Sequence, residues 1–106
     1  VIMNEIAFIN EYKQAITRLK AGEDLTEKEI KTLIWDSHVI DEIEGETHRW
    51  YREVKTIIKI DSELYAIDWN RGLTERQENE YPNQPYRVVR KEKQITVTYY
   101  EREENE

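Results

Sequence analysis

Two carboxylates and a lysine form the arrangement in this sequence that best matches metal-assisted activation of water. Asp41 precedes Glu53 and Lys55, the order of acid, acid, base by which hairpin strands of many nucleases hold Mg²⁺. The pattern is weakly specific, because a chain with 37% charged residues produces such triplets by chance. Strand alternation also places Glu53 and Lys55 on a solvated face, where a cross-strand charge pair is the better interpretation. A metal-dependent nuclease is therefore the third hypothesis.

The two histidines, His38 and His48, are the next candidate ligands. Together with scattered carboxylates such as Asp36 they match no structural zinc pattern, and a turn near Gly45 would place them far apart on a hairpin. The three glycines are isolated from one another, so no glycine-rich phosphate loop is present, and the chain has no cysteine. The sequence predicts no metal ion, no cofactor and no enzymatic activity.

The composition predicts one acidic domain that spans residues 1–106. A chain of 106 residues with 38% hydrophobic content can bury one modest core. It contains no apolar run near the roughly 20 residues that cross a bilayer, so we expect a cytoplasmic protein without a membrane partner. The net charge of -7 argues against nonspecific binding to phosphates and favours a basic protein partner.

The aromatic residues favour rings that carry a polar group, with 3 Trp and 7 Tyr against 1 Phe. Such rings are enriched at protein interfaces, and several of the tyrosines cannot fit into one small core. Some lie near a basic stretch that consists of Arg87, Arg90, Lys91 and Lys93. Stacking of single-stranded bases on these rings gives the second hypothesis, a nucleic-acid-binding regulator, although the net charge weighs against it.

The elements that must position these residues begin with a helical hairpin over residues 1–36. Apolar residues recur every three or four positions up to Lys20, which predicts a helix that ends at Ala21 and Gly22. Thr26 and Glu29 form a capping box for a second helix over 26–36. The stripe of the first helix consists of Ile2, Ile6, Ile9, Tyr12, Ile16 and Leu19.

After Asp36 the apolar period changes to two, which predicts an antiparallel sheet of four or five strands over residues 37–100. We expect turns at 44–46 and 61–62 and strands at 38–43, 48–60, 64–69, 86–91 and 95–100. The inner face of the second strand would carry Trp50, Val54, Thr56, Ile58 and Ile60. The predicted fold class is thus α+β, with the helical hairpin packed on the sheet and an acidic tail at 101–106. Because a strand at 95–100 could pair at a sheet edge, both a monomer and a homodimer remain open.

The polar segment 69–82 contains a folding signal of its own. Thr74 and Gln77 form a second capping box, which predicts a short helix over 74–80, and Gly72 is expected to take a positive φ before it. Local structure does not require the remaining side chains, which form the candidate partner-binding surface: Arg71, Glu75, Arg76, Glu78, Glu80 and Tyr81.

Part of the chain resembles small proteins encoded by phages, prophages and plasmids of Gram-positive bacteria. The resemblance lies in Arg49-Trp50, Tyr65 to Glu75, Gln77 to Glu80 and Gln84 to Val88, covers mainly residues 49–90 and includes no established catalytic motif. It implies a mobile-element origin. In size and charge the chain is also similar to anti-CRISPR proteins that inhibit type II effector nucleases. By that analogy, our leading expectation is a non-enzymatic inhibitor in the bacterial cytoplasm that blocks a basic surface of a host protein.

Overall fold

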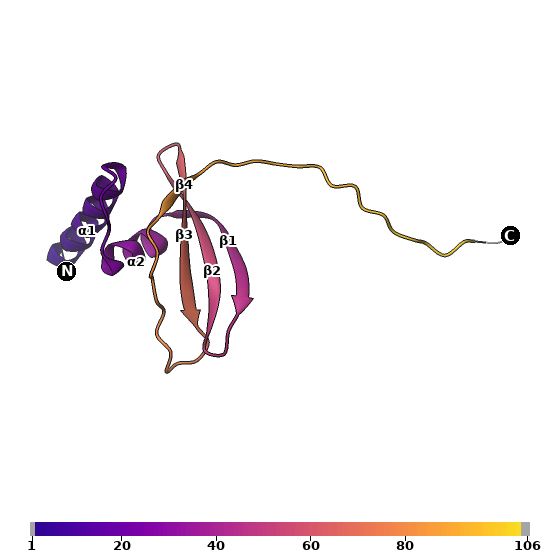
Figure 1. Cartoon of the computed structure of the whole chain (residues 1–106). Helices are drawn as coiled ribbons and strands as arrows, with labels where there is room; N and C mark the ends of the chain where they lie inside the picture. The colour runs from indigo at the N-terminus through magenta and orange to yellow at the C-terminus, as the bar shows by residue number, and fades with distance from the viewer. Residues whose placement is uncertain (1, 105–106) are drawn as a thin grey trace.

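The computed structural model describes residues 2–104, with side chains from residue 10 onward. Two helices, α1 (Ile2–Lys20) and α2 (Glu27–Asp36), precede an antiparallel sheet. The sheet contains β1 (His38–Thr47), β2 (Tyr51–Ile60), β3 (Glu63–Gly72) and β4 (Tyr86–Val88), which are neighbours in chain order. The predicted α+β class is confirmed, with α2 lying between α1 and the sheet (Figure 1).

Local sequence signals fix both ends of the connection between the helices. Gly22 has a φ of 75° after the last turn of α1, a left-handed conformation that glycine adopts without the steric cost of a Cβ atom. The predicted capping box is present at α2: the Glu29 amide donates to Thr26 Oγ1 at 3.2 Å, and Glu29 Oε1 accepts from the Thr26 amide at 2.9 Å. These contacts place the start of α2 where the sequence predicts it.

The core lies between the helices and one face of β2 and β3. Of the stripe predicted for α1, Tyr12, Ile16 and Leu19 pack against this core, whereas the side chains of Ile2, Ile6 and Ile9 lie outside the described residues. The buried side chains that α2 and this face of the two strands contribute are Ile30, Leu33, Ile34, Val54, Thr56, Ile58, Ile60, Tyr65, Ile67 and Trp69. The predicted inner face of the second strand is therefore confirmed for every residue except Trp50.

The first hairpin turns later than the sequence predicts. β1 continues through Thr47, and residues 48–50 connect it to β2, so the predicted turn at 44–46 is wrong. Gly45 instead lies at a register shift between Glu44 and Thr47, where an added Cβ atom would lie 3.4 Å from the backbone oxygen of Glu53. A glycine inside a strand commonly marks a bulge of this kind.

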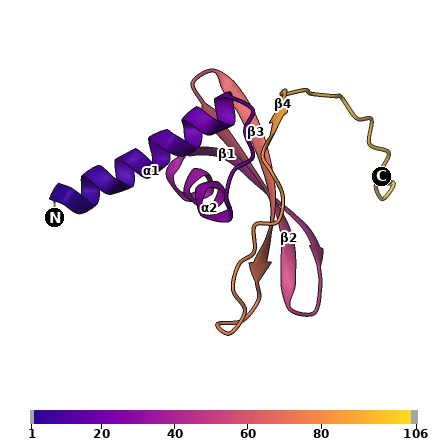
Figure 2. The same cartoon turned by 60° about the vertical axis from the view of Figure 1, so that its left-hand side comes forward.

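Two further elements differ from the prediction. Residues 74–80 form a turn rather than a helix, because Asn70 pairs with Glu80 and returns the chain to the sheet before a helix of stable length can form. β4 ends at Val88, and residues 89–104 leave the sheet without regular secondary structure (Figures 1 and 2). The predicted strand at 95–100 is thus not paired with any described part of the chain.

Candidate protein-binding surface

Two connections lie side by side at the end of the sheet that extends beyond the helices (Figures 1 and 2). They are the β1–β2 turn, residues 48–50, and the loop after β3, residues 72–80; we call them together the sheet tip. The Leu73 amide donates to the Trp50 carbonyl oxygen at 3.0 Å and joins them. This hydrogen bond makes one surface of two segments that are separate in the sequence.

The loop of the sheet tip is closed by its own hydrogen bonds. The Gly72 amide donates to Asn79 Oδ1 at 2.9 Å, and Asn70 and Glu80 exchange two backbone hydrogen bonds, each of 2.9 Å. Within the loop, the Gln77 amide donates to the Thr74 carbonyl oxygen at 3.0 Å. A loop whose ends meet in this way is a compact structure that can present side chains in fixed positions.

The sheet tip exposes two large apolar side chains. Trp50 is 50% exposed and Leu73 is 44% exposed. A shallow hollow of about 560 Å³ is lined by Trp50 and by residues 74–77, and the Arg49 guanidinium lies 4.7 Å from the centroid of the Trp50 ring. Strand alternation predicts Trp50 in the core, and this prediction is wrong; only its position next to a turn could have indicated that it is exposed. An exposed tryptophan beside a hollow has the character of an interface hot spot.

Charged side chains occupy the loop of the sheet tip. Glu75, Arg76, Glu78 and Glu80 are all exposed there, and Glu75 and Arg76 line the hollow beside Trp50. The loop is therefore acidic as well as exposed, which makes these four residues of the predicted surface available to a partner.

Tyr81 is not part of that surface. It is only 6% exposed, and its ring stacks on Trp69 with centroids 5.4 Å apart and planes inclined by 22°. Its hydroxyl oxygen accepts a hydrogen bond from Trp35 Nε1 at 3.3 Å. The prediction that Tyr81 contacts a partner is wrong, because the side chain anchors the end of the loop in the core.

Arg71 also has structural partners. Its guanidinium lies 5.2 Å from the centroid of the Trp69 ring and forms ion pairs with Glu42 and, at 3.5 Å, with Glu44. These contacts connect β3 to β1 across β2. Arg71 is half-buried and paired with two carboxylates. These tertiary contacts explain its presence in β3, which the local sequence did not explain.

The acid, acid, base triplet is not assembled. Asp41 pairs with Ile57, so Glu53 lies four residues away along β2, a separation of about 13 Å at the usual rise of a strand. Lys55 pairs with Ile43. The interpretation of these residues as a nuclease site is therefore wrong, because register separates the two carboxylates.

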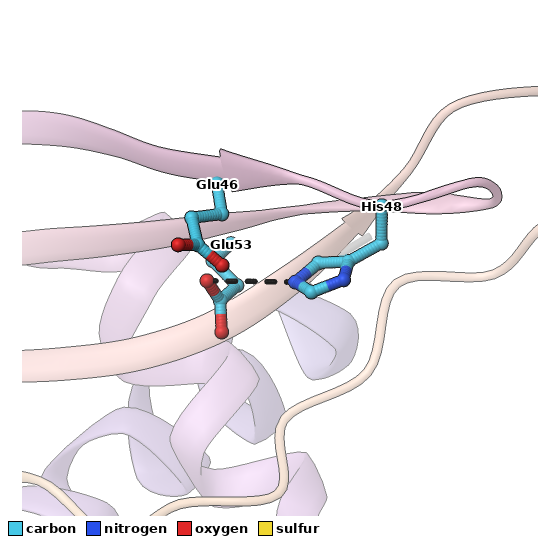
Figure 3. A group of neighbouring side chains, drawn as sticks. All are labelled: Glu46, His48 and Glu53. Carbon is cyan, nitrogen blue, oxygen red and sulfur yellow. Dashed lines mark ion pairs between the residues drawn. The ribbon is translucent and has the colours of Figure 1, made fainter.

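Glu53 instead meets a histidine of the β1–β2 turn. Figure 3 shows that the side chains of Glu46, His48 and Glu53 converge. One possible ligand atom from each residue lies within 4.8 Å of the other two. His48 Nε2 lies 3.6 Å from Glu53 Oε2, and its ring stacks on Tyr51 at a centroid distance of 4.5 Å. An imidazole and two carboxylates are ligands that Zn²⁺ accepts, so this is the group among the described residues that could hold a metal ion. His38 lies at the opposite end of β1, paired with Lys59.

Comparison of the chain with family models, curated proteins and solved structures finds no match. None of the helices in residues 2–104 combines the length and the apolar character that crossing a membrane requires. The geometry of the sheet tip and the charge of the chain are therefore the features that bear on function.

Proposed function

We propose that this protein is a non-enzymatic inhibitor that binds a host protein through the sheet tip and blocks a basic, nucleic-acid-binding surface. The observation that carries the proposal is the exposed pair of Trp50 and Leu73 with the exposed carboxylates of Glu75, Glu78 and Glu80 on the same loop. Such a surface offers an apolar centre with a charged rim, which is the arrangement of many protein interfaces.

The position of Trp50 supports a role as an anchor. The backbone hydrogen bond from Leu73 to Trp50 and the stacked Arg49 guanidinium hold the turn. A side chain that is already ordered loses little conformational entropy when a partner covers it, so more of the buried area contributes to affinity. The hollow beside the ring gives a partner side chain a place to enter.

The charge of the chain supports the choice of partner. Carboxylates compete with nucleic-acid phosphates for clusters of lysine and arginine, and a net charge of -7 speeds association with a basic surface at low salt. Type II CRISPR effector nucleases hold the guide and target strands in a positively charged channel. Together with the resemblance to mobile-element proteins, this charge leads us to propose type II CRISPR effector nucleases as the partner class.

The second hypothesis, a nucleic-acid-binding regulator, receives less support from the geometry. Arg87 pairs with Glu63 at 3.5 Å, and Arg90 pairs with Glu92 at 2.9 Å. Half of the basic stretch is thus engaged with carboxylates. A gel shift that weakens when Arg87, Arg90 and Lys91 are replaced by glutamine would favour this second function.

The proposal can be tested by charge reversal on the sheet tip. The variant Glu75→Lys/Glu78→Lys/Glu80→Lys should bind a type II effector nuclease at least about tenfold more weakly than the wild type, since each lost pair with a basic partner costs on the order of 1 kcal/mol. The matched control is Glu101→Lys/Glu103→Lys/Glu104→Lys, which changes the net charge equally in the exposed tail. Affinity and nuclease inhibition are measured for both variants.

The role of the anchor is tested in the same assay. Trp50→Ala should abolish most of the binding, and Trp50→Phe should retain part of it because a ring remains. The proposed function fails if the wild type forms no complex with such a nuclease. If the two triple variants weaken binding equally, the sheet tip is not the contact surface and the net charge alone explains the loss of affinity.

A further inference from the structure

Residues 94–100 have the sequence of a strand but lie alone. Ile95, Val97 and Tyr99 alternate with Thr96, Thr98 and Tyr100, and β-branched and aromatic residues at this period favour a sheet. The exposed fractions are 70% for Ile95, 72% for Val97, 71% for Tyr99 and 94% for Tyr100. We call residues 94–100 the arm; Figure 1 shows it far from the body of the protein. So many exposed apolar side chains in one segment indicate a contact surface.

The sequence before the arm opposes a hairpin with β4. Residues 89–93 read Val-Arg-Lys-Glu-Lys and contain none of the glycine, asparagine, aspartate, proline or serine residues that form tight turns. The chain accordingly continues away from β4 (Figure 2). The arm therefore has no local route to a partner strand.

The sheet has a free edge that could receive such a strand. β1 is the first strand in the order β1-β2-β3-β4 and has no neighbour on its outer side among residues 2–104. Its unpaired backbone groups can accept another strand, and it exposes Val39, Ile40 and Ile43 by 43%, 48% and 48%. An apolar arm and an apolar edge thus occur in the same chain.

Charge selects what can pair with this edge. β1 carries four carboxylates, Asp41, Glu42, Glu44 and Glu46, and no lysine or arginine. Arg71 and Arg52 pair with Glu42 and Glu44, so Asp41 and Glu46 are the carboxylates that would repel a second β1 edge. The arm itself is uncharged and follows Arg90, Lys91 and Lys93. With Gln94 opposite Glu46, an antiparallel arrangement brings Lys93 next to Glu46. A parallel arrangement over the same residues brings Glu101 there. Charge therefore favours the antiparallel arrangement.

The arm of one copy cannot pair with its own β1 in the antiparallel direction. Val88 pairs with Leu64, Leu64 with Lys59 and Lys59 with His38, so the arm leaves the sheet at the end where β1 begins. Starting an antiparallel strand beside Glu46 requires a path of about 30 Å, from strand rise and strand spacing. The chain from Val88 to Gln94 spans at most about 21 Å. A second molecule must supply the strand.

We propose that the arm of one copy adds as an antiparallel strand to the outer edge of β1 in a second copy. The second copy returns its own arm in the same way, which closes a dimer with two-fold symmetry. The pairing covers the apolar side chains of both segments. This self-association is independent of the proposed inhibitory function.

Truncation tests the proposal. The wild-type chain of 12.9 kDa should be a dimer in light scattering after size exclusion, and a variant that ends at Lys93 should be a monomer. The truncation removes a segment that packs against nothing in the described chain, and circular dichroism with thermal unfolding checks that it still folds. A wild type that stays monomeric at about 100 μM, or a truncated variant that stays dimeric, overturns the proposal.

Cysteine cross-linking tests the pairing, because the chain has no native cysteine. If Gln94 lies opposite Glu46, Val97 lies opposite Ile43. Mixed under oxidising conditions, Val97→Cys and Ile43→Cys should give a disulfide-linked dimer of the two variants. The control is a mixture of Val97→Cys and Leu73→Cys, since Leu73 is an exposed residue of the sheet tip. This mixture should give little disulfide-linked dimer. Predominant linkage of Val97→Cys to itself would overturn the proposal by showing that the arms pair with each other, and equal linkage in the control would show that no edge is selected.

Discussion

A side chain at position 72 would collide with the backbone of Gln77, because a Cβ atom on Gly72 would lie 2.1 Å from the Gln77 carbonyl oxygen. The sequence suggested that Gly72 is needed for a positive φ. In the described chain, Gly22 is the glycine with that conformation. Gly72 is instead required by close approach, and this contact shapes the loop that presents Glu75 and Glu78.

Replacing Gly72 by alanine should displace the loop and destabilise the fold by about 2 kcal/mol, since overpacking against backbone cannot be relieved by a rotamer change. Urea unfolding measures the loss, and affinity for the proposed partner should fall with it. Gly45→Ala is the comparison, because its nearest contacts of 3.4 Å are much looser. A Gly72→Ala variant with wild-type stability and affinity would contradict this explanation.

Thr56 and Trp69 form a polar pair inside the core. Trp69 Nε1 donates to Thr56 Oγ1 at 2.8 Å, and both residues are 2% exposed. Thr56→Val keeps the shape but leaves the indole N–H without an acceptor, which costs about 1–3 kcal/mol. In a Trp69→Phe background the same change should cost much less. A double-mutant cycle by urea unfolding checks this, and equal costs in both backgrounds would show that the hydrogen bond contributes nothing.

Arg71 and Arg76 should behave differently although both were candidates for the same surface. Arg71→Ala removes ion pairs with Glu42 and Glu44 and a contact with Trp69. Because the pairs are partly exposed, the stability loss should be about 1 kcal/mol or less. Arg76→Ala removes an exposed side chain from the loop and should leave stability unchanged. Thermal unfolding of both variants measures the difference, and a larger loss from Arg76→Ala would reverse these assignments.

Asp36 should make the fold less stable at neutral pH than at acid pH. Burial raises the pKa of this carboxyl above its ordinary value of 3.8, and Asp36 is the last residue of α2, where the helix dipole disfavours an anion. A raised folded-state pKa means that the folded protein holds the proton more tightly than the unfolded chain. The destabilisation therefore appears as pH rises through 3.8 to the raised pKa and is complete above it.

Asp36→Asn should accordingly increase stability at pH 7 by about 0.5 kcal/mol, the usual size of a charge effect at a helix end. At pH 3 the variant and the wild type should be equally stable. Urea unfolding at both pH values measures this. A gain at pH 3 as large as the gain at pH 7 would show that the carboxylate charge is not the cause.

The sequence by itself determined the two helices and the alternation of β2 in this protein, whereas the capping pattern of Thr74 and Gln77 gave a turn and no helix. The capping box of Thr26 and Glu29, the reversal at Gly22 and the alternation along β2 each depend on residues only a few positions apart. Such signals act through backbone hydrogen bonds and one buried face, so they can be read without knowing the rest of the chain. They were sufficient for the α+β class.

Only the tertiary structure decided which side chains are free. Tyr81 is buried because Trp69, twelve residues earlier, lies beneath its ring, and Trp50 is exposed because β1 extends to Thr47 and moves the turn. Register likewise separates Asp41 from Glu53 and brings Glu53 to His48. These relations depend on the pairing of strands across the sheet. Since one shift of register changes every facing pair, periodicity could predict the strands but could not predict the surface that they build.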